Sequence, residues 1–493
     1  MTILEPQISI DDVSERSGVS QLGTKPLEAK PVDATPVKAA VARALLAALD
    51  SDYSAYCILS GYDDLPDSFD TDIDFMVTTE EFASVPQTIL KVARATGTRL
   101  FHTVGHELSA RSFSLGFQAG EQLIIVQPDS SADYRHFGLL WLRSDEVLSA
   151  RRQHPRGFWI PAAAHEFAYY LIKRLNKRYL DEKHGEKLHR LFMEDSAGCE
   201  RMIERYWKGS NRAALMRMAR TNDWVEMTTA FESIRSELKR NSAESFEERL
   251  KTAPEHVLHQ VRRALNPTGG WIAIMGPDGA GKSAVIEAIR DQFRFAYHKV
   301  KCFHLRPKAL YRGNDAHTAV TDPHGKPPRG WIPSVAKVFF MVADYWIGYL
   351  LQIAPAMQKS QLIVFDRYFY DLLVDSKRVR YGGPAWLLRF AARIIPHPHL
   401  VILLDAPADV LWQRKQEVPF NEVMRQRDGY CKVARGLSFA KIVNAAQPLP
   451  DVIRDVDMAI VDYYERRTAQ RLGLNTPSLT PSPKSTTTPS RQC

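Results

Sequence analysis

Hydrophobic residues in the C-terminal half of the chain follow two alternating patterns. Short apolar runs, typical of buried strands, alternate with longer segments whose apolar residues recur every three or four positions, as on one face of a helix. The apolar runs are WIAIM (271–275), KVKCFHL (299–305), LIVFD (362–366), HLVILLD (399–405) and DVIRDVD (451–457). Strands that alternate with helices predict a parallel sheet covered by helices, and therefore an α/β domain.

The first half of the chain has a different pattern. ATPVKAAVARALLAAL (34–49) predicts a helix, and alternating or apolar short runs follow up to about residue 155, which indicates an α+β unit. Residues 160–265 show almost no strand pattern, and segments such as HEFAYYLIKRLNKRYL (165–180) have helical spacing. NPTGG (266–270) is a cluster of helix- and strand-breaking residues that marks a boundary.

These patterns divide the chain into five segments. The ends, residues 1–35 and 473–493, are polar or rich in Ser, Thr and Pro, and we expect them to be disordered. Between them we expect an α+β domain (36–155), a helical extension (156–265) and an α/β domain (268–472). A chain of 493 residues is long enough for two or three domains.

Composition narrows the class of protein. A hydrophobic content of 45% and a charged content of 25% are typical of soluble globular proteins. The net charge of +8 favours phosphate-bearing ligands but is too diffuse to indicate nucleic-acid binding. The five cysteines show no C-x-x-C spacing, which argues against a zinc site or a disulfide framework. Together with an N-terminus that lacks a secretion signal, this predicts a cytoplasmic protein.

The most apolar stretch is VFFMVADYWIGYLLQIA (338–354). It contains Asp344 and Gln352 and is shorter than a comfortable membrane span. We therefore expect a buried helix here and no membrane insertion.

One motif carries a specific chemistry. MGPDGAGKS (275–283) fits G-x-x-x-x-G-K-[ST] and lies between a predicted strand and a predicted helix. In such a loop, backbone N–H groups cradle phosphate oxygens at the helix N-terminus. Lys282 can reach the β- and γ-phosphates, and the Ser283 hydroxyl can bind Mg²⁺. The expected ATP-binding residues are Gly276, Asp278, Gly279, Ala280, Gly281, Lys282, Ser283 and Ala284.

Two later segments offer further catalytic groups. LIVFDRYFYD places Asp366 and Arg367 at the carboxyl end of a strand, on the ligand side of a parallel sheet. There Asp366 can support Mg²⁺ or accept a proton, and Arg367 can grip a phosphate or carboxylate on the acceptor. A strand ending at Asp405 leads into a helical stretch with Arg414, Arg425 and Arg427, which either close over the transferring phosphoryl group or form a solvated face.

The motifs of residues 270–472 together resemble the thymidylate kinase family of P-loop kinases. The matching features are Asp278 before Gly-Ala-Gly-Lys, the triplet Asp366-Arg367-Tyr368, and the segment Leu404–Pro407 ahead of the arginine-bearing stretch. The resemblance implies an ATP- and Mg²⁺-dependent kinase. The family's R-E-P-G-G-like segment has only Arg306 and Pro307 as counterparts in FHLRPKALYRGNDAHT (303–318), and the insert VTDPHGKPPRGW (320–331) follows it. This departure bears on the acceptor, which Arg306 can still hold if it is anionic.

A second motif lies in the first half. CILSGYDDLPDSFDTDIDFMV (57–77) contains a Ser-Gly turn followed by Asp72 and Asp74, which point to the same face of a strand. Two such carboxylates suit one or two divalent ions that bind a nucleoside triphosphate. The pattern resembles the nucleotidyltransferase fold, which implies a third carboxylate from a later strand. Asp129 is the candidate, although Pro128 interrupts pairing beside it. Lys173, Arg174, Lys177 and Arg178 are available on a helix behind the site, or form a solvated helix face.

Other interpretations of this segment remain. Asp70, Asp72, Asp74 and Glu81 have the spacing of an EF-hand, but Phe75 stands where the calcium loop needs glycine. A nucleotidyltransferase-like domain that has lost activity and serves as a scaffold is the stronger alternative.

The sequence thus predicts ATP-dependent phosphoryl transfer to a small-molecule or nucleotide acceptor with an anionic group, coupled to nucleotidyl transfer by the first domain. The alternative is an ATP-binding switch with an inert first domain. The expected catalytic residues are Lys282, Asp366, Arg367, Arg414, Asp72 and Asp74, and the expected metal ligands are Ser283, Asp366, Asp72, Asp74 and Asp129.

Overall fold

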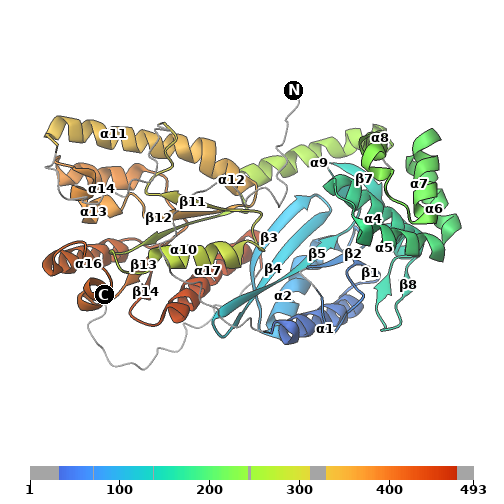
Figure 1. Ribbon diagram of the computed structural model, residues 1–493, viewed down its shortest axis with the longest axis horizontal. Coiled ribbons are helices and arrows are strands. Elements are labelled where there is room, and N and C mark those ends of the chain that lie inside the picture. Colours follow the sequence, from blue (N-terminus) through green and yellow to red (C-terminus); the bar gives the residue numbers. More distant parts are fainter. Residues whose placement is uncertain (1–32, 70–71, 137, 242–245, 311–328, 475–493) are drawn as a thin grey trace. The chain divides into compact units, whose positions relative to one another are not determined.

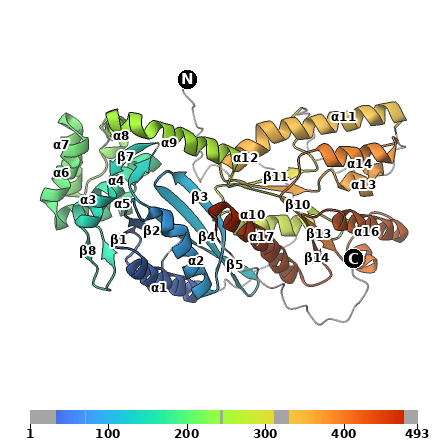
Figure 2. The same ribbon diagram turned by 180° about the vertical axis from the view of Figure 1, so that it is seen from behind.

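The computed structural model describes residues 33–69, 72–136, 138–241, 246–310 and 329–474 (Figures 1 and 2). Most of the two ends that the sequence predicts to be disordered, as well as Asp70 of the EF-hand alternative and most of the insert before residue 331, lie outside the described residues.

A five-stranded sheet forms the first part of the described chain. Its strands are β1 (Tyr56–Ser60), β2 (Asp72–Val77), β3 (Arg99–Glu107), β4 (Ala110–Ala119) and β5 (Gln122–Ser131). Their order is β1-β2-β5-β4-β3, and β2 and β5 are parallel while the other neighbours are antiparallel. Helices α1 (Thr35–Asp52) and α2 (Val85–Thr96) bury their apolar sides on one face, against Ile73, Phe75 and Val126. This is the α+β arrangement that the pattern predicts.

Short elements and a run of helices follow. The hairpins are β6 (Tyr134–His136) with β7 (Leu139–Leu142), and β8 (Arg152–Gln153) with β9 (Trp159–Ile160), separated by α3 (Ser144–Ser149). The helices are α4 (Ala163–Lys177), α5 (Glu182–Glu194), α6 (Ser196–Tyr206), α7 (Gly209–Thr221), α8 (Met227–Arg240) and α9 (Phe246–Leu265). Phe167 and Leu171 of α4, spaced four residues apart, lie in a common core with Leu188 and Ile203.

A second sheet begins directly after NPTGG and is parallel throughout. Its strands are β10 (Gly270–Met275), β11 (Val300–His304), β12 (Leu362–Asp366), β13 (Leu400–Asp405) and β14 (Ala440–Asn444), in the order β11-β12-β10-β13-β14. The α/β class with a parallel sheet is therefore confirmed for this part. Parallel strands carry all their C-terminal loops on one edge, where ligands of such sheets bind.

The expected strand at 451–457 is wrong. DVIRDVD lies inside helix α17 (Leu449–Leu472), and the fifth strand is β14 (Ala440–Asn444), which precedes it. Val452, Val456 and Ile460 repeat every four residues and are all buried, so the apolar residues of 451–457 belong to a helical stripe that continues beyond the run. The run looked like a strand because it is short.

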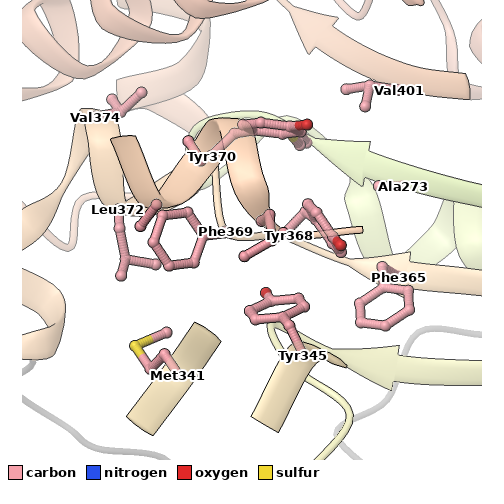
Figure 3. Packing of buried hydrophobic residues seen from close by; sticks show 14 of the residues in the cluster. Ala273, Met341, Tyr345, Phe365, Tyr368, Phe369, Tyr370, Leu372, Val374 and Val401 are labelled. Carbon is pink, nitrogen blue, oxygen red and sulfur yellow. The ribbon is translucent and has the colours of Figure 1, made fainter. Parts of the chain in front are cut away.

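Side chains of this sheet alternate between two cores. Ile272 and Ile274 face α10 (Lys282–Phe293) and α17, while Trp271 and Ala273 face the opposite side. That side is covered by α11 (Trp331–Gly348), α12 (Ala354–Gln358) and α14 (Ala385–Ile394). Figure 1 shows the helices on the two faces, and Figure 3 shows the aromatic packing from β12 to α13 (Asp371–Val374). The remaining helices are α15 (Ala408–Arg414) and α16 (Phe420–Arg435).

The apolar stretch 338–354 is helical, as expected, but only one side of it is buried. Met341 and Tyr345 pack into the core, whereas Phe339 and Leu351 are exposed. Among the described residues, Trp331–Gln358 is the one helical segment long and apolar enough to span a membrane, by length and composition alone. A third of its most apolar window is buried in the protein (33%), and a single helix of this kind is weak evidence for a span.

Candidate functional sites

The glycine-rich loop joins the central strand β10 to helix α10 at the ligand-binding edge of the parallel sheet. Gly276, Gly279 and Gly281 have φ values of 150°, 84° and 86°, which favour glycine. A Cβ atom on Gly276 would lie 2.7 Å from the carbonyl oxygen of Leu404, and one on Gly279 would lie 2.7 Å from that of Leu411. The loop can therefore keep this conformation, with its N–H groups at the helix N-terminus, only with glycine at these positions.

Lys282 is held by the loop itself. Its Nζ donates to the carbonyl oxygens of Gly276 (2.9 Å) and Pro277 (2.7 Å) and lies 3.7 Å from a carboxylate oxygen of Asp278. Burial, followed by repulsion from Arg367, lowers the pKa of Lys282 to about 8. A negative phosphate group beside Nζ would favour the charged form of the lysine.

Asp278 connects the loop to two arginines. It accepts hydrogen bonds from Arg367 and, at 2.7 Å, from Arg378. Burial would raise the pKa of Asp278, but Arg367, Lys282 and Arg378 together hold it well below its usual range. The carboxylate is therefore ionised, and it fixes both arginines at the phosphate-binding loop.

Arg367 lies at the centre of a buried network. It is 5% exposed, has a φ of 65°, and donates to Asp371 (3.2 Å) and to the Tyr430 hydroxyl (3.1 Å) as well as to Asp278. Burial would lower its pKa, but Asp371, Tyr430 and Asp278 raise it. The guanidinium thus already has three protein partners, and an acceptor would have to share them.

Asp366 ends β12 next to the loop, since it pairs in register with Ile274 of β10. One carboxylate oxygen lies 3.2 Å from Nδ1 of His304, and the other, Oδ1, is buried and has no hydrogen-bond partner among the described residues. Burial would raise the pKa of Asp366, but the His304 contact lowers it. A buried carboxylate oxygen left open in this place suits a divalent ion.

The arginines after β13 make contacts within the protein. Arg414 donates to the carbonyl oxygen of Ala445 (2.7 Å), Arg425 pairs with Glu422 (2.6 Å), and Arg427 forms a two-pronged pair with Asp405 (2.8 and 2.9 Å). Their closure over a phosphoryl group stays a prediction that would require these contacts to open.

A second cationic region follows β11. Arg306 donates to Asp344 at 2.9 Å, and that fully buried carboxylate also accepts the backbone N–H groups of Lys308 (3.2 Å) and Leu310 (2.8 Å). Burial, followed by repulsion from Arg329, Arg306 and Arg380, lowers the pKa of Lys337 to about 8. Positive charge is therefore concentrated around Lys337, next to the strand end that carries Arg306.

Comparison with known proteins agrees with this geometry. Residues 274–439 match the family model for thymidylate kinase. The chain is 28% identical over 201 residues to a probable thymidylate kinase of Thermococcus gammatolerans, covering 38% of this chain and 94% of the relative. It is 25% identical over 206 residues to a probable thymidylate kinase of Pyrobaculum calidifontis, covering 39% and 95%.

The C-terminal domain is thymidylate kinase-like. The resemblance inferred from the loop, Asp366-Arg367-Tyr368 and the strand ending at Asp405 is confirmed for this part of the chain. In the thymidylate kinase-like domain, sequence reasoning missed the partners that orient these residues. Asp371 and Tyr430 hold Arg367, and Asp344 holds Arg306. For Asp344 a signal existed, because it is a lone carboxylate within an apolar helix.

The N-terminal sheet brings its three predicted carboxylates together. Asp74 of β2 lies opposite Asp129 of the parallel strand β5, and oxygens of Asp72, Asp74 and Asp129 lie within 4.8 Å of one another. β5 continues through Pro128. Its pairing with β4 is interrupted there, because proline has no N–H to donate. The three side chains thus form an acidic cluster at one place in the sheet.

Neighbouring groups set the charge of this acidic cluster. Asp74 accepts hydrogen bonds from the Ser60 hydroxyl (2.8 Å) and from Nζ of Lys173 (2.6 Å). Burial, followed by repulsion from Asp74 and Asp72, raises the pKa of Asp129 to about 7. Its Oδ1 atom is buried and has no hydrogen-bond partner in the part of the chain that the structure describes. Like-charged carboxylates held this close are what a divalent ion relieves.

Proposed function

We propose that the thymidylate kinase-like domain transfers the γ-phosphoryl group of ATP to an anionic small molecule or nucleotide. The observation that carries the proposal is the convergence of the phosphate-binding loop, Asp366 and Arg367 on one edge of the parallel sheet. The ATP phosphates would lie along the loop N–H groups, with Lys282 leaving the carbonyl oxygens of Gly276 and Pro277 to meet them.

Magnesium fits the same edge of the sheet. The Ser283 hydroxyl and the open Oδ1 of Asp366 are oxygen ligands of the kind that Mg²⁺ prefers. When bound, the ion would neutralise phosphate charge and orient the γ-phosphate. Asp366 is also the candidate to accept the proton of an acceptor hydroxyl, since it ends the strand beside the loop.

The acceptor would bear negative charge. Arg306, Arg329, Lys337 and Arg380 are close enough together to depress the lysine pKa, and an anion among them would relieve that repulsion. Thymidine monophosphate is the first acceptor to test, because residues 274–439 match thymidylate kinases. Other nucleoside monophosphates and phosphorylated small molecules follow, since the segment after β11 departs from the family pattern.

The test is ADP formation from Mg²⁺-ATP by the full chain with a panel of such acceptors. Lys282→Ala should lower acceptor-dependent turnover by at least about a hundredfold, because the loop loses its one charge on the phosphates. Lys441→Ala, which changes an exposed lysine of the same domain, is the control. Slow ADP release that no acceptor accelerates would instead indicate an ATP-dependent switch.

A second function is favoured by the acidic cluster. Three carboxylates within 4.8 Å, one of them with an open buried oxygen, suit divalent ions that bind a nucleoside triphosphate and activate an attacking oxygen. We therefore propose nucleotidyl transfer by the N-terminal domain. Pyrophosphate release by the full chain should disappear in Asp72→Asn but not in Asp63→Asn, an exposed acid outside the cluster. If the unchanged chain releases no pyrophosphate with any nucleoside triphosphate and acceptor, the domain is a scaffold.

A further inference from the structure

A group of basic side chains lies on the elements that surround the acidic cluster. His136 ends β6, Arg178 follows the last residue of α4, and Arg235 and Lys239 lie one turn apart on α8. We call these four residues the basic group. None of them is used by the phosphate-binding loop of the C-terminal domain.

The four side chains share one space. Arg178 lies 3.6 Å and Arg235 4.0 Å from the two carboxylate oxygens of Glu232. Burial, followed by repulsion from Arg235 and Lys239, lowers the pKa of His136 to about 4. Burial also lowers the pKa of Lys239, with Arg235 and Arg178 adding repulsion. The side chain of Glu232 is 66% exposed and can balance only one of the three permanent positive charges.

Arg235 is the group that most needs a further partner. Its side chain is only 10% exposed, and its Nε atom is buried without a hydrogen-bond partner among the described residues. A buried guanidinium donor that is left unpaired costs free energy, and an anion that accepts from it would recover that cost. Arg235 therefore has a donor that a bound anion can satisfy.

A series of contacts leads from the acidic cluster toward the basic group. Lys173 contacts both Asp74 (2.6 Å) and the Tyr169 hydroxyl (3.2 Å), and the Tyr169 ring packs on that of Tyr134 (4.7 Å between centroids). His136 is two residues after Tyr134 in β6, whose pairing with β7 shifts register between Tyr134 and Arg135.

Helix α4 connects the two groups in the same way. Lys177 lies one turn beyond Lys173, and Arg178 follows it directly. Asp72 and Asp74 both act on the pKa of Lys177, so this lysine still faces the acidic cluster.

We propose that the basic group binds the phosphate chain of a nucleoside triphosphate whose other end lies at Asp72, Asp74 and Asp129. This rests on the second candidate function, the nucleotidyl transfer, and adds to it the residues that would select a polyphosphate. Guanidinium groups suit this role because they donate two parallel hydrogen bonds to phosphate oxygens. Lys173 lies at the carboxylates and Lys177 one turn further along α4, which is the direction that a phosphate chain continuing past a bound metal would take.

The experiment measures binding of inorganic tripolyphosphate by calorimetry, without Mg²⁺, to the full chain carrying Lys282→Ala, which weakens the loop of the C-terminal domain. Adding Arg235→Gln or Lys239→Gln should each weaken binding about tenfold, the loss of roughly one charge-assisted contact. Arg220→Gln is the control, because Arg220 is an exposed arginine of α7 paired with Glu200. Lys239 is exposed, so Lys239→Gln should fold normally. If Arg235→Gln proves unstable, the Lys239→Gln result decides the test.

Unchanged tripolyphosphate affinity in both variants, or no binding to the Lys282→Ala chain, would overturn the proposal. Inorganic phosphate binding as tightly as tripolyphosphate would overturn it too, since the site would then hold a single phosphoryl group. The measurement needs no metal and no turnover. A chain that binds tripolyphosphate through Arg235 and Lys239 but releases no pyrophosphate would therefore refute the nucleotidyl transfer. It would still support phosphate binding by the basic group.

Discussion

Replacing Arg367 tests whether the buried network holds the thymidylate kinase-like site together. Arg367→Met keeps much of the side-chain length and removes the charge. The change leaves Asp371, which is 2% exposed, with the Tyr430 hydroxyl as its remaining side-chain partner, and leaves Asp278 with Arg378 and the more distant Lys282. Breaking a buried ion pair by removing one partner costs about 3–5 kcal/mol, because the other charge stays buried.

The free-energy cost of the unpaired buried charge can be separated from the cost of lost packing. Arg367→Met combined with Asp371→Met removes both charges, so the double variant should recover a large part of the lost stability. Tyr430→Phe removes a hydroxyl that donates to Asp371 and accepts from Arg367 but leaves both charges paired, and should cost about 1.5–3 kcal/mol. We therefore expect the free energy of unfolding to be highest for the parent, lower for Tyr430→Phe and lowest for Arg367→Met. The double variant should be more stable than Arg367→Met.

Urea unfolding followed by tryptophan fluorescence, with the midpoints and slopes compared, provides the measurement. ATP affinity of the folded variants should be measured in parallel, since Arg367 also fixes Asp278 of the loop. If Arg367→Met loses less than about 1 kcal/mol, as an exposed pair would, the network does not stabilise the fold. A large rise in acceptor KM with unchanged stability would then assign Arg367 to the acceptor.

Three further outcomes are expected. Gly276→Ala should lower the free energy of unfolding by about 1–3 kcal/mol in thermal melts, because its Cβ would lie 2.7 Å from the Leu404 carbonyl oxygen at a φ of 150°, whereas Gly436→Ala, whose Cβ would have ordinary contacts, should change little. His399 is half-buried, and desolvation followed by repulsion from Arg467 and Arg471 lowers its pKa to about 3, so unfolding takes up a proton below about pH 6.5. The parent should therefore lose stability relative to His399→Gln by about 1.4 kcal/mol per pH unit as the pH falls from 6 to 4, and parallel curves would contradict this assignment. Asp129→Asn should weaken Mn²⁺ binding to the N-terminal cluster in a full chain carrying Lys282→Ala, while equal binding would show that Asp129 is not a ligand.

Local sequence patterns were sufficient to predict the strands and the phosphate-binding loop at the ligand-binding edge of the parallel sheet. Apolar runs located β10, β12 and β13, and the loop motif fixed the positions of Gly276 and Lys282 because its spacing is a steric requirement. Asp129 was named only from the resemblance to the nucleotidyltransferase fold, and the structure is what pairs it with Asp74. The roles of these residues stay predictions.

Sequence reasoning was weaker where distant segments decide the outcome. The strand expected at 451–457 became part of α17 because burial against the sheet follows the longer four-residue repeat. The partners of Arg367 come from α13 and α16, and no spacing in the chain announces that these helices meet. The residues of the basic group likewise come from β6, from the end of α4 and from α8, which are separated by up to about a hundred residues.

Strand β11 lies at the edge of the parallel sheet, and its residues are half-buried or exposed. The segment that leaves it, beginning at His304 and Leu305, can therefore differ between related enzymes while β10, β12 and β13 keep their packing. Acceptor choice and ATP chemistry are in this sense separable during divergence. Under the proposed kinase function, exchanging residues 305–330 with their counterpart from a thymidylate kinase is expected to change acceptor preference and to leave ATP binding unchanged.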